Sequence, residues 1–297
     1  MKNHTRRVII ALITLIVLAR EGQAQERPIY TQYMFNETTF NPAYAGSSER
    51  LSATALYRKQ WVGVEGAPST QALSVHAPIN KSSIALGLQV LNDKIGVSSR
   101  TELQSMFAYR IRFNDKSKLS MGIQTGVRWN NEGYSQLYDA TGDVQFSESL
   151  QQARFLVGTG VYYHTDRFYL GASVPVIRTA QGVGNHYFIT SGYVFDMGEH
   201  LKVKPNVLLK LADNAPASYD LNTTLLIHEI VWFGVSYRSS ESVGLLTRLQ
   251  ITEELSFGYA FDLPVSGISP YGSGSHEMML NYRIRIPSTS YQSPRYF

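Results

Sequence analysis

The feature that most limits the fold is a strict two-residue alternation that recurs along the chain. From Lys118 to Trp129 the odd positions carry apolar residues and one threonine, while the even positions carry glycine, serine, glutamine, lysine and arginine. Successive side chains of a β-strand point to opposite faces, whereas an amphipathic helix needs apolar residues three and four positions apart. The pattern therefore predicts a strand with one apolar and one polar face.

Fourteen segments show this alternation, and most have the nine to eleven residues that a tilted strand needs to cross a bilayer. An even number of antiparallel strands is usual in bacterial outer-membrane barrels. We therefore predict an all-β chain that forms a transmembrane antiparallel β-barrel of about 14 strands. The predicted strands lie near residues 50–58, 70–79, 83–92, 98–113, 118–131, 153–164, 167–175, 185–196, 200–211, 217–228, 230–238, 242–251, 255–262 and 275–286.

The connections between these strands alternate in length. Tight links near residues 80–82 and 114–117 contrast with longer ones at 59–69, 132–152 and 263–274. Short periplasmic turns and longer external loops are typical of bacterial barrels, so we expect both barrel ends of the chain in the periplasm. A soluble β-sandwich also alternates, but its outward face needs more charge than the 17% found in this sequence.

The chain divides into four parts. Residues 1–24 are expected to be a secretory signal peptide, because Lys2, Arg6 and Arg7 precede an apolar stretch that is too short to span a bilayer as a helix. Residues 25–49 form an N-terminal segment, 50–286 the outer-membrane barrel and 287–297 a short tail. The N-terminal segment is rich in aromatic residues that are costly to leave in water, so we expect it to plug the barrel or pack at the periplasmic mouth.

Motifs for chemistry are missing from the sequence. It has no Gly-x-Ser-x-Gly elbow, no phosphate loop, no His-Glu-x-x-His pair and no cysteine. We therefore expect no enzyme activity, no cofactor, no metal and no small-molecule substrate. Without its first 24 residues the chain is close to neutral and has no basic run, which argues against nucleic-acid binding. Charged residues on the inward faces predict a network of ion pairs in the lumen, and the alternative for them is a pore for an anionic solute.

A set of motifs carries a resemblance to a known family. The segment 32–36 reads Gln-Tyr-Met-Phe-Asn, 41–47 reads Asn-Pro-Ala-Tyr-Ala-Gly-Ser, and 58–63 reads Arg-Lys-Gln-Trp-Val-Gly. Together these motifs resemble the PorP/SprF family, outer-membrane proteins of the type IX secretion and gliding systems of Bacteroidetes. The sequence departs from that family at Glu37, where proline is common. Further similar segments are 66–71, 87, 92–96, 108–110, 118–122 and 274–277.

The resemblance implies a barrel in the bacterial outer membrane that works with the secretion machinery. Its expected partners are outer-membrane lipid, other type IX secretion components and a secreted surface protein that it helps to export or anchor. Two other functions stay open: a porin-like solute channel and a secreted β-sandwich adhesin.

Five residues are candidates for partner binding. Tyr33, Phe35 and Tyr44 lie in the aromatic N-terminal segment, and Arg58 and Trp61 lie where the first strand meets its long loop. The alternative for Trp61 is a girdle residue at the membrane interface, and the alternative for Arg58 is an ion pair in the lumen.

Overall fold

The computed structural model describes residues 29–79, 83–114, 117–135, 149–177, 185–213 and 215–285. The expected signal peptide, residues 25–28 and the tail from residue 286 lie outside this part of the chain. Within it the elements are η1 (Tyr33–Phe35), η2 (Glu37–Thr39), η3 (Pro42–Tyr44), β1 (Arg50–Lys59), β2 (Ser69–Pro78), β3 (Ile84–Ile95), β4 (Ser98–Arg112), β5 (Lys118–Glu132), β6 (Leu150–His164), β7 (Phe168–Val174), β8 (His186–Tyr193), β9 (Phe195–Asp196), β10 (Leu201–Ala212), β11 (Ala215–Ile227), β12 (Val231–Arg238), β13 (Ser242–Gln250), β14 (Leu255–Pro264) and β15 (Ser275–Arg285).

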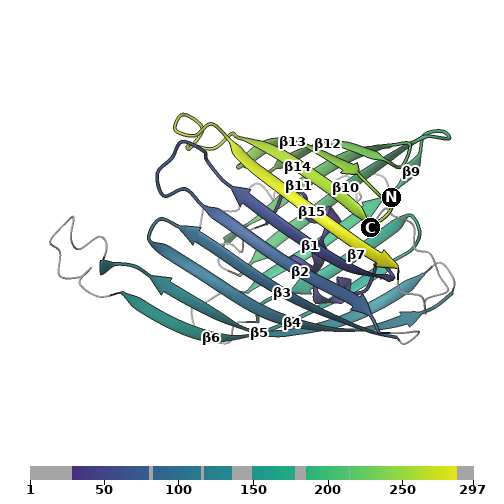
Figure 1. Ribbon diagram of the computed structural model, residues 1–297, viewed down its shortest axis with the longest axis horizontal. Helices are drawn as coiled ribbons and strands as arrows, with labels where there is room; N and C mark the ends of the chain where they lie inside the picture. The colour runs from purple at the N-terminus through teal and green to yellow at the C-terminus, as the bar shows by residue number, and fades with distance from the viewer. Residues whose placement is uncertain are drawn as a thin grey trace, which may run out of the picture.

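The strands form one closed antiparallel barrel (Figure 1). Consecutive strands pair along the sheet, and the pairing of β1 with β15 and of β10 with β11 completes the ring. Strand β9 continues β8 on the same partner: Gly192 lies opposite Asn206 and Phe195 opposite Val203, without a change of register. The described strands therefore make a 14-strand barrel, which confirms the predicted fold and shows that the β-sandwich alternative is wrong.

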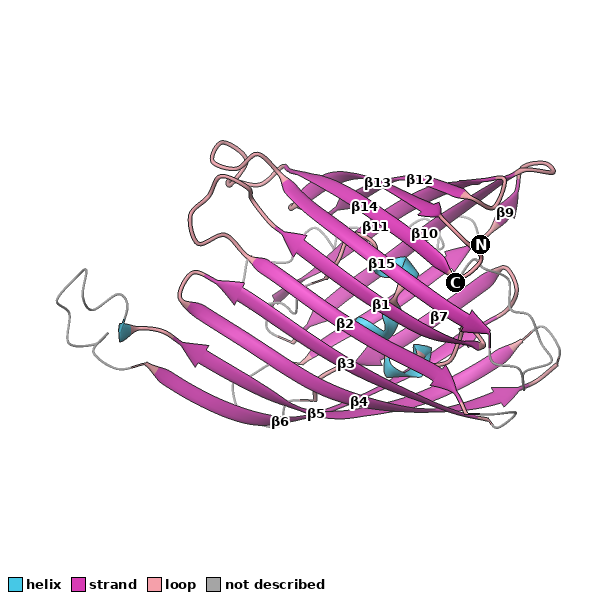
Figure 2. Cartoon of the chain, in the orientation of Figure 1, coloured by secondary structure: helices cyan, strands magenta, loops and turns pink. Residues whose placement is uncertain are grey.

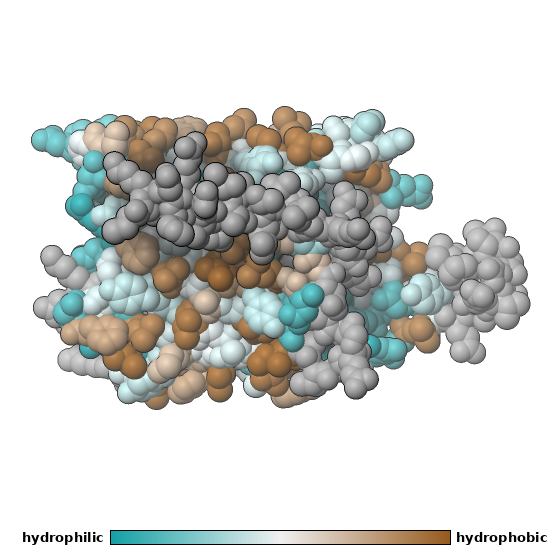
Figure 3. Space-filling model, turned by 180° about the vertical axis from the view of Figure 1, so that it is seen from behind, coloured by the Kyte–Doolittle hydropathy of each residue, from teal (hydrophilic) through white to brown (hydrophobic). Residues whose placement is uncertain are grey.

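The wall is apolar outside and polar inside. On β5, Ile123 is 54% exposed on the outer surface, whereas the next residue, Gln124, is 1% exposed inside. Most large apolar side chains of the strands share the outward orientation, and one side of the wall shows them in brown in Figure 3. An outward apolar face is the arrangement of a lipid-facing barrel. Among the described residues, no helix is both long and apolar enough to cross a bilayer.

The outward register of β5 leads to a test. Replacing Ile123 with arginine places a charge in lipid, which costs roughly 2–4 kcal/mol at the midplane of such barrels. We expect Ile123→Arg to lower the fraction of folded barrel, measured by heat-modifiable gel mobility of purified membranes, while Ile123→Leu leaves it unchanged. Equal folding of the two variants would contradict the register.

The two ends of the barrel differ. At one end, here called the short-turn end, β4 meets β5 within five residues, from Phe113 to Ser117. At the opposite, long-loop end, β1 meets β2 across residues 60–68 and β14 meets β15 across residues 265–274. Strands β4, β5 and β6 each have 15 residues and project furthest at the long-loop end (Figure 1). Because bacterial barrels usually have short periplasmic turns, we expect the short-turn end to face the periplasm.

Candidate functional site

The lumen holds residues 29–49, which we call the plug. Every one of these residues is buried, and the three short helices η1, η2 and η3 lie inside the wall (Figure 2). Helix η3 starts at Asn41, whose side-chain oxygen accepts a hydrogen bond from the backbone N–H of Ala43 at 3.0 Å, and Pro42 suits the first turn because it has no N–H to satisfy. The structure places residues 29–49 of the expected N-terminal segment inside the lumen, where they extend from the short-turn end to the level of Arg58, near the far end of β1.

Glycines on the inner wall make room for the plug. A Cβ atom on Gly122 would lie 2.3 Å from the backbone nitrogen of Ala43, and one on Gly160 would lie 2.2 Å from the side-chain oxygen of Asn41. A Cβ on Gly258 would lie 2.0 Å from the side chain of Gln32. Any larger residue at these positions would collide with the plug as it lies.

The aromatic residues of the plug form its packed core. Phe35 meets Trp232 of the wall edge to face at 5.6 Å between ring centroids, and Tyr44 meets Tyr162 at 5.4 Å. Tyr33 is 1% exposed and contacts Phe40 within the plug. Burying each such ring stabilises the packed state by roughly 1.5–3 kcal/mol relative to exposure. The three predicted aromatic candidates therefore hold the plug in the lumen.

Arg58 joins the plug to the wall. Its guanidinium lies 2.8 Å from Asp262 and 2.8 Å from Glu277, and it donates a hydrogen bond to the Thr31 hydroxyl at 2.8 Å. Glu277 also accepts the backbone N–H groups of Thr31 and Gln32, each at 2.9 Å. Arg58 is 2% exposed. It therefore forms the lumen ion pair that was the alternative to partner binding in the sequence analysis.

A second ion-pair group anchors the other end of the plug. Glu49 lies 2.8 Å from Arg110 and 2.8 Å from Lys118, next to the short turn between β4 and β5. Arg110 also donates to the Gly46 carbonyl at 3.0 Å. The plug is thus tied to the wall near both of its ends.

A third group lies beside the first residues of the plug. Arg238 bridges Asp220 at 3.2 Å and Glu241 at 2.9 Å, and donates to the Ile29 carbonyl at 3.3 Å. Glu241 sits in the turn after β12. Its burial disfavours the charge, but Arg238 and Lys210 outweigh that effect and lower the pKa of the Glu241 carboxyl.

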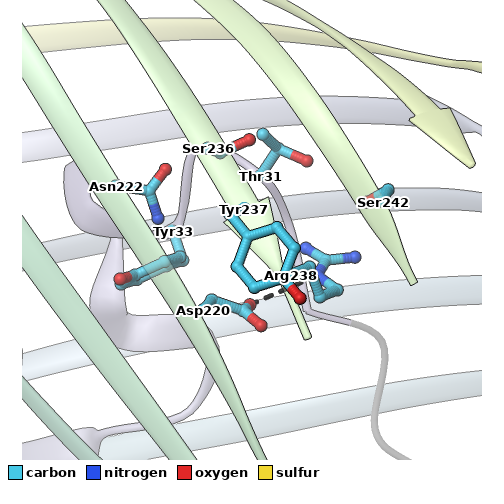
Figure 4. A pocket seen from close by; sticks show the side chains of 8 residues that line it. All are labelled: Thr31, Tyr33, Asp220, Asn222, Ser236, Tyr237, Arg238 and Ser242. Carbon is cyan, nitrogen blue, oxygen red and sulfur yellow. Dashed lines mark hydrogen bonds and ion pairs between the residues drawn. The ribbon is translucent and has the colours of Figure 1, made fainter. Parts of the chain in front are cut away.

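A small pocket opens between this third group and the plug (Figure 4). Its volume of about 10 Å³ is enough for about one water molecule. Such a space is far below the 300–1,000 Å³ typical of small-molecule sites. Its lining consists of Thr31, Tyr33, Asp220, Asn222, Ser236, Tyr237, Arg238 and Ser242.

Trp61 lies apart from the other four candidates. It is half-buried in the loop after β1, with a backbone φ of 45°, a left-handed conformation that is rare for a bulky residue. Its backbone N–H donates to the Ser275 hydroxyl at 3.2 Å. The structure therefore places Tyr33, Phe35, Tyr44 and Arg58 at different levels inside the lumen, whereas Trp61 lies in the loop after β1.

Sequence reasoning missed the glycines that seat the plug. The structure places Gly160 against the side chain of Asn41, a contact that the sequence does not indicate. The available signal was the inward position of Gly122, Gly160 and Gly258 within alternating strands. Among the residues that the structure describes, no group of three histidine, cysteine, aspartate or glutamate side chains could hold a metal ion.

These features define a class: an outer-membrane β-barrel whose lumen is occupied by its own N-terminal segment. The family model for the type IX secretion system membrane protein PorP/SprF matches residues 22–282. The chain therefore belongs to the PorP/SprF family of the type IX secretion system, and its place is the outer membrane. No curated protein matches the sequence.

Solved structures show similar folds at low sequence identity. The outer membrane protein Omp33 of Acinetobacter baumannii is 10% identical, with a TM-score of 0.50 over 80% of this chain and 100% of that one. The monoaromatic hydrocarbon channel CymD is 11% identical, with a TM-score of 0.47 over 89% of this chain and 96% of that one. The first of these supports the barrel fold, and neither identity reaches the level at which function could be transferred.

Proposed function

We propose that the chain is an accessory component of type IX secretion that binds a secreted surface protein, or another secretion component, through loops at the long-loop end. The observation that carries this proposal is the plug. It is buried throughout and tied to the wall by Arg58, Arg110 and Arg238, so it occupies the part of the lumen that a transported solute would need. We therefore expect a partner protein to bind to surfaces outside the lumen.

The loops at the long-loop end have the order that a binding surface needs. The backbone N–H of Val62 donates to the Gly274 carbonyl at 2.8 Å, and that of Ser273 donates to Val62 at 2.8 Å. The backbone N–H of Gly96, in the loop after β3, donates to the Gly66 carbonyl at 2.8 Å and so connects this loop to the loop after β1. We call these three segments, 60–68, 95–98 and 265–274, the rim loops. Their mutual hydrogen bonds fix the backbone before a partner arrives, which reduces the entropy lost on binding.

Apolar side chains are also exposed at the long-loop end. Tyr271 is 73% exposed, Val265 55% and Ile95 52%, although all three lie beyond the middle of the barrel wall. Exposed rings on a rigid backbone are common anchors at protein interfaces. We therefore assign the partner-binding surface to Trp61 and Tyr271.

A substitution separates this role from that of a girdle residue. We expect Trp61→Ala to abolish surface display of the client protein while the amount of folded barrel stays near normal, because Trp61 lies in a loop outside the strands and is only half-buried. Display is measured by antibody labelling of intact cells, and barrel abundance by immunoblot of outer membranes. Trp129→Ala is the matched control, since Trp129 lies on the outer face of β5 and is 45% exposed.

Two results would contradict the proposal. If both tryptophan variants lower barrel abundance and client display in step, Trp61 is a girdle residue. If Trp61→Ala leaves display unchanged, the rim loops do not bind the client.

A further inference from the structure

The inward faces of β4, β5 and β6 carry three arginines near the long-loop end. Arg128 lies directly opposite Glu102 on one neighbour and directly opposite Arg154 on the other, and Arg100 lies two residues before Glu102. We call Arg100, Arg128 and Arg154 the arginine cluster. Arg128 is six residues beyond the plug contact at Gly122, or about 20 Å along the strand. The cluster therefore lies in the mouth of the barrel and is separate from the ion pairs that hold the plug.

Two carboxylates partly balance this cluster. One oxygen of Glu102 receives Arg128 at 2.7 Å and lies 3.6 Å from the Nε of Arg100, and the other oxygen accepts the Gln104 amide at 2.8 Å. Asp93 lies 3.1 Å from Arg100. Asp93 and Glu102 thus pair with Arg100 and Arg128, and within the part of the chain that the structure describes neither of these carboxylates pairs with Arg154. The next carboxylate on this face, Glu132, is four residues further along β5 and hydrogen-bonds to Ser98.

Arg154 is the cation with the least compensation. It is exposed, and its guanidinium donates to the Gln152 amide oxygen at 3.0 Å. Like charges directly opposite each other on neighbouring strands destabilise a sheet. The Nε of Arg100, which is buried, has no hydrogen-bond acceptor among the described atoms. The exposed guanidinium of Arg154 therefore offers donors that an added anion would satisfy.

We propose that the arginine cluster binds an oxyanion, a carboxylate or a phosphate, in the mouth of the barrel above the plug. Arg128 and Arg154 would hold it from opposite strands, because planar guanidinium groups match carboxylate and phosphate oxygens in two-point contacts. Asn130 and Gln152, which also lie directly opposite each other on this face, add neutral amide donors. This site is independent of the proposed partner binding by the rim loops.

The test measures how anions stabilise the intact purified barrel. Heat-modifiable gel mobility gives the temperature at which half of the protein unfolds, in detergent at low salt, with sodium phosphate, sodium acetate or lipid A micelles added. We expect phosphate and acetate to raise that temperature in the unmodified protein. Arg154→Gln should raise it without any anion, because the like-charge pair is gone, and should weaken the apparent affinity for phosphate at least tenfold. Arg167→Gln is the control, since Arg167 pairs with Asp196 at the short-turn end.

The outcomes decide between the possible sources of the anion. A response to phosphate and acetate that Arg154→Gln loses and Arg167→Gln keeps supports the oxyanion site. A response to lipid A alone, equal in both variants, would place the phosphate contacts on the outer wall and overturn the proposal. An equal response of all three proteins to phosphate, or none in the unmodified protein, would also overturn it.

Discussion

Replacing Gly122 with valine is expected to convert a closed barrel into one that conducts ions. A Cβ at this position would lie 2.3 Å from the nitrogen of Ala43 and 2.5 Å from the carbonyl carbon of Pro42. Both are backbone atoms, so the collision cannot be relieved by turning a side chain and the plug must move. Valine itself is favourable in a strand, so the wall should still form.

The measurement is the current through a planar lipid bilayer that contains the purified protein. We expect no steady conductance from the unmodified protein and open-pore currents from Gly122→Val. Gly267→Val is the control, because Gly267 lies in a rim loop with no atom within 4 Å of an added Cβ. If the unmodified protein already conducts as well as the variant, the plug does not close the lumen, and the porin-like alternative becomes the better description.

The second large effect is expected from Arg58→Ala. This change leaves Asp262 and Glu277, whose side chains are 3% and 1% exposed, without their buried cation. Removing one partner of a buried ion pair typically costs about 3–5 kcal/mol, whereas an exposed pair contributes at most about 1 kcal/mol. Unfolding in urea, followed by tryptophan fluorescence, should show the larger loss for Arg58→Ala and the smaller for Arg167→Ala.

A combined variant checks that the lost charge balance is the cause. Asp262→Asn and Glu277→Gln, added to Arg58→Ala, remove both buried charges and should restore part of the lost stability. Equal losses for Arg58→Ala and Arg167→Ala would show that the network around Arg58 contributes little.

The strands of the barrel wall could be predicted from the sequence because the pattern that defines each strand lies within that strand. Each strand must present apolar residues to lipid at every second position, so residues such as Leu119, Ile123 and Val127 reveal their side of the sheet without any knowledge of neighbours. The observed strands begin and end within a few residues of the predicted ranges, and the segment predicted at 185–196 contains both β8 and β9. The aromatic composition of the N-terminal segment also predicted that it would be buried.

The contacts inside the lumen could not be predicted in the same way. Nothing local to Arg58 indicates that Glu277, 219 residues later, supplies its carboxylate, because that contact depends on ring closure between β1 and β15. Alternation identifies Gly122 as inward-facing but does not tell which part of the chain approaches it. For the same reason the sequence grouped Arg58 with Trp61, whereas the structure places the two side chains in different surroundings.

The direct connection between the plug and β1 has a consequence for the order of assembly. The plug is made first, yet Thr31 is held by Glu277 on the last strand, 246 residues later. A chain that inserts strand by strand can attach the Glu49 end of the plug once β4 and β5 are in place, but it cannot fix Thr31 and Gln32 on Glu277 until the final hairpin arrives. Correct seating of Thr31 and Gln32 against Glu277 can therefore occur only after the first and last strands have met, so these contacts mark a finished molecule and distinguish it from a partly inserted one.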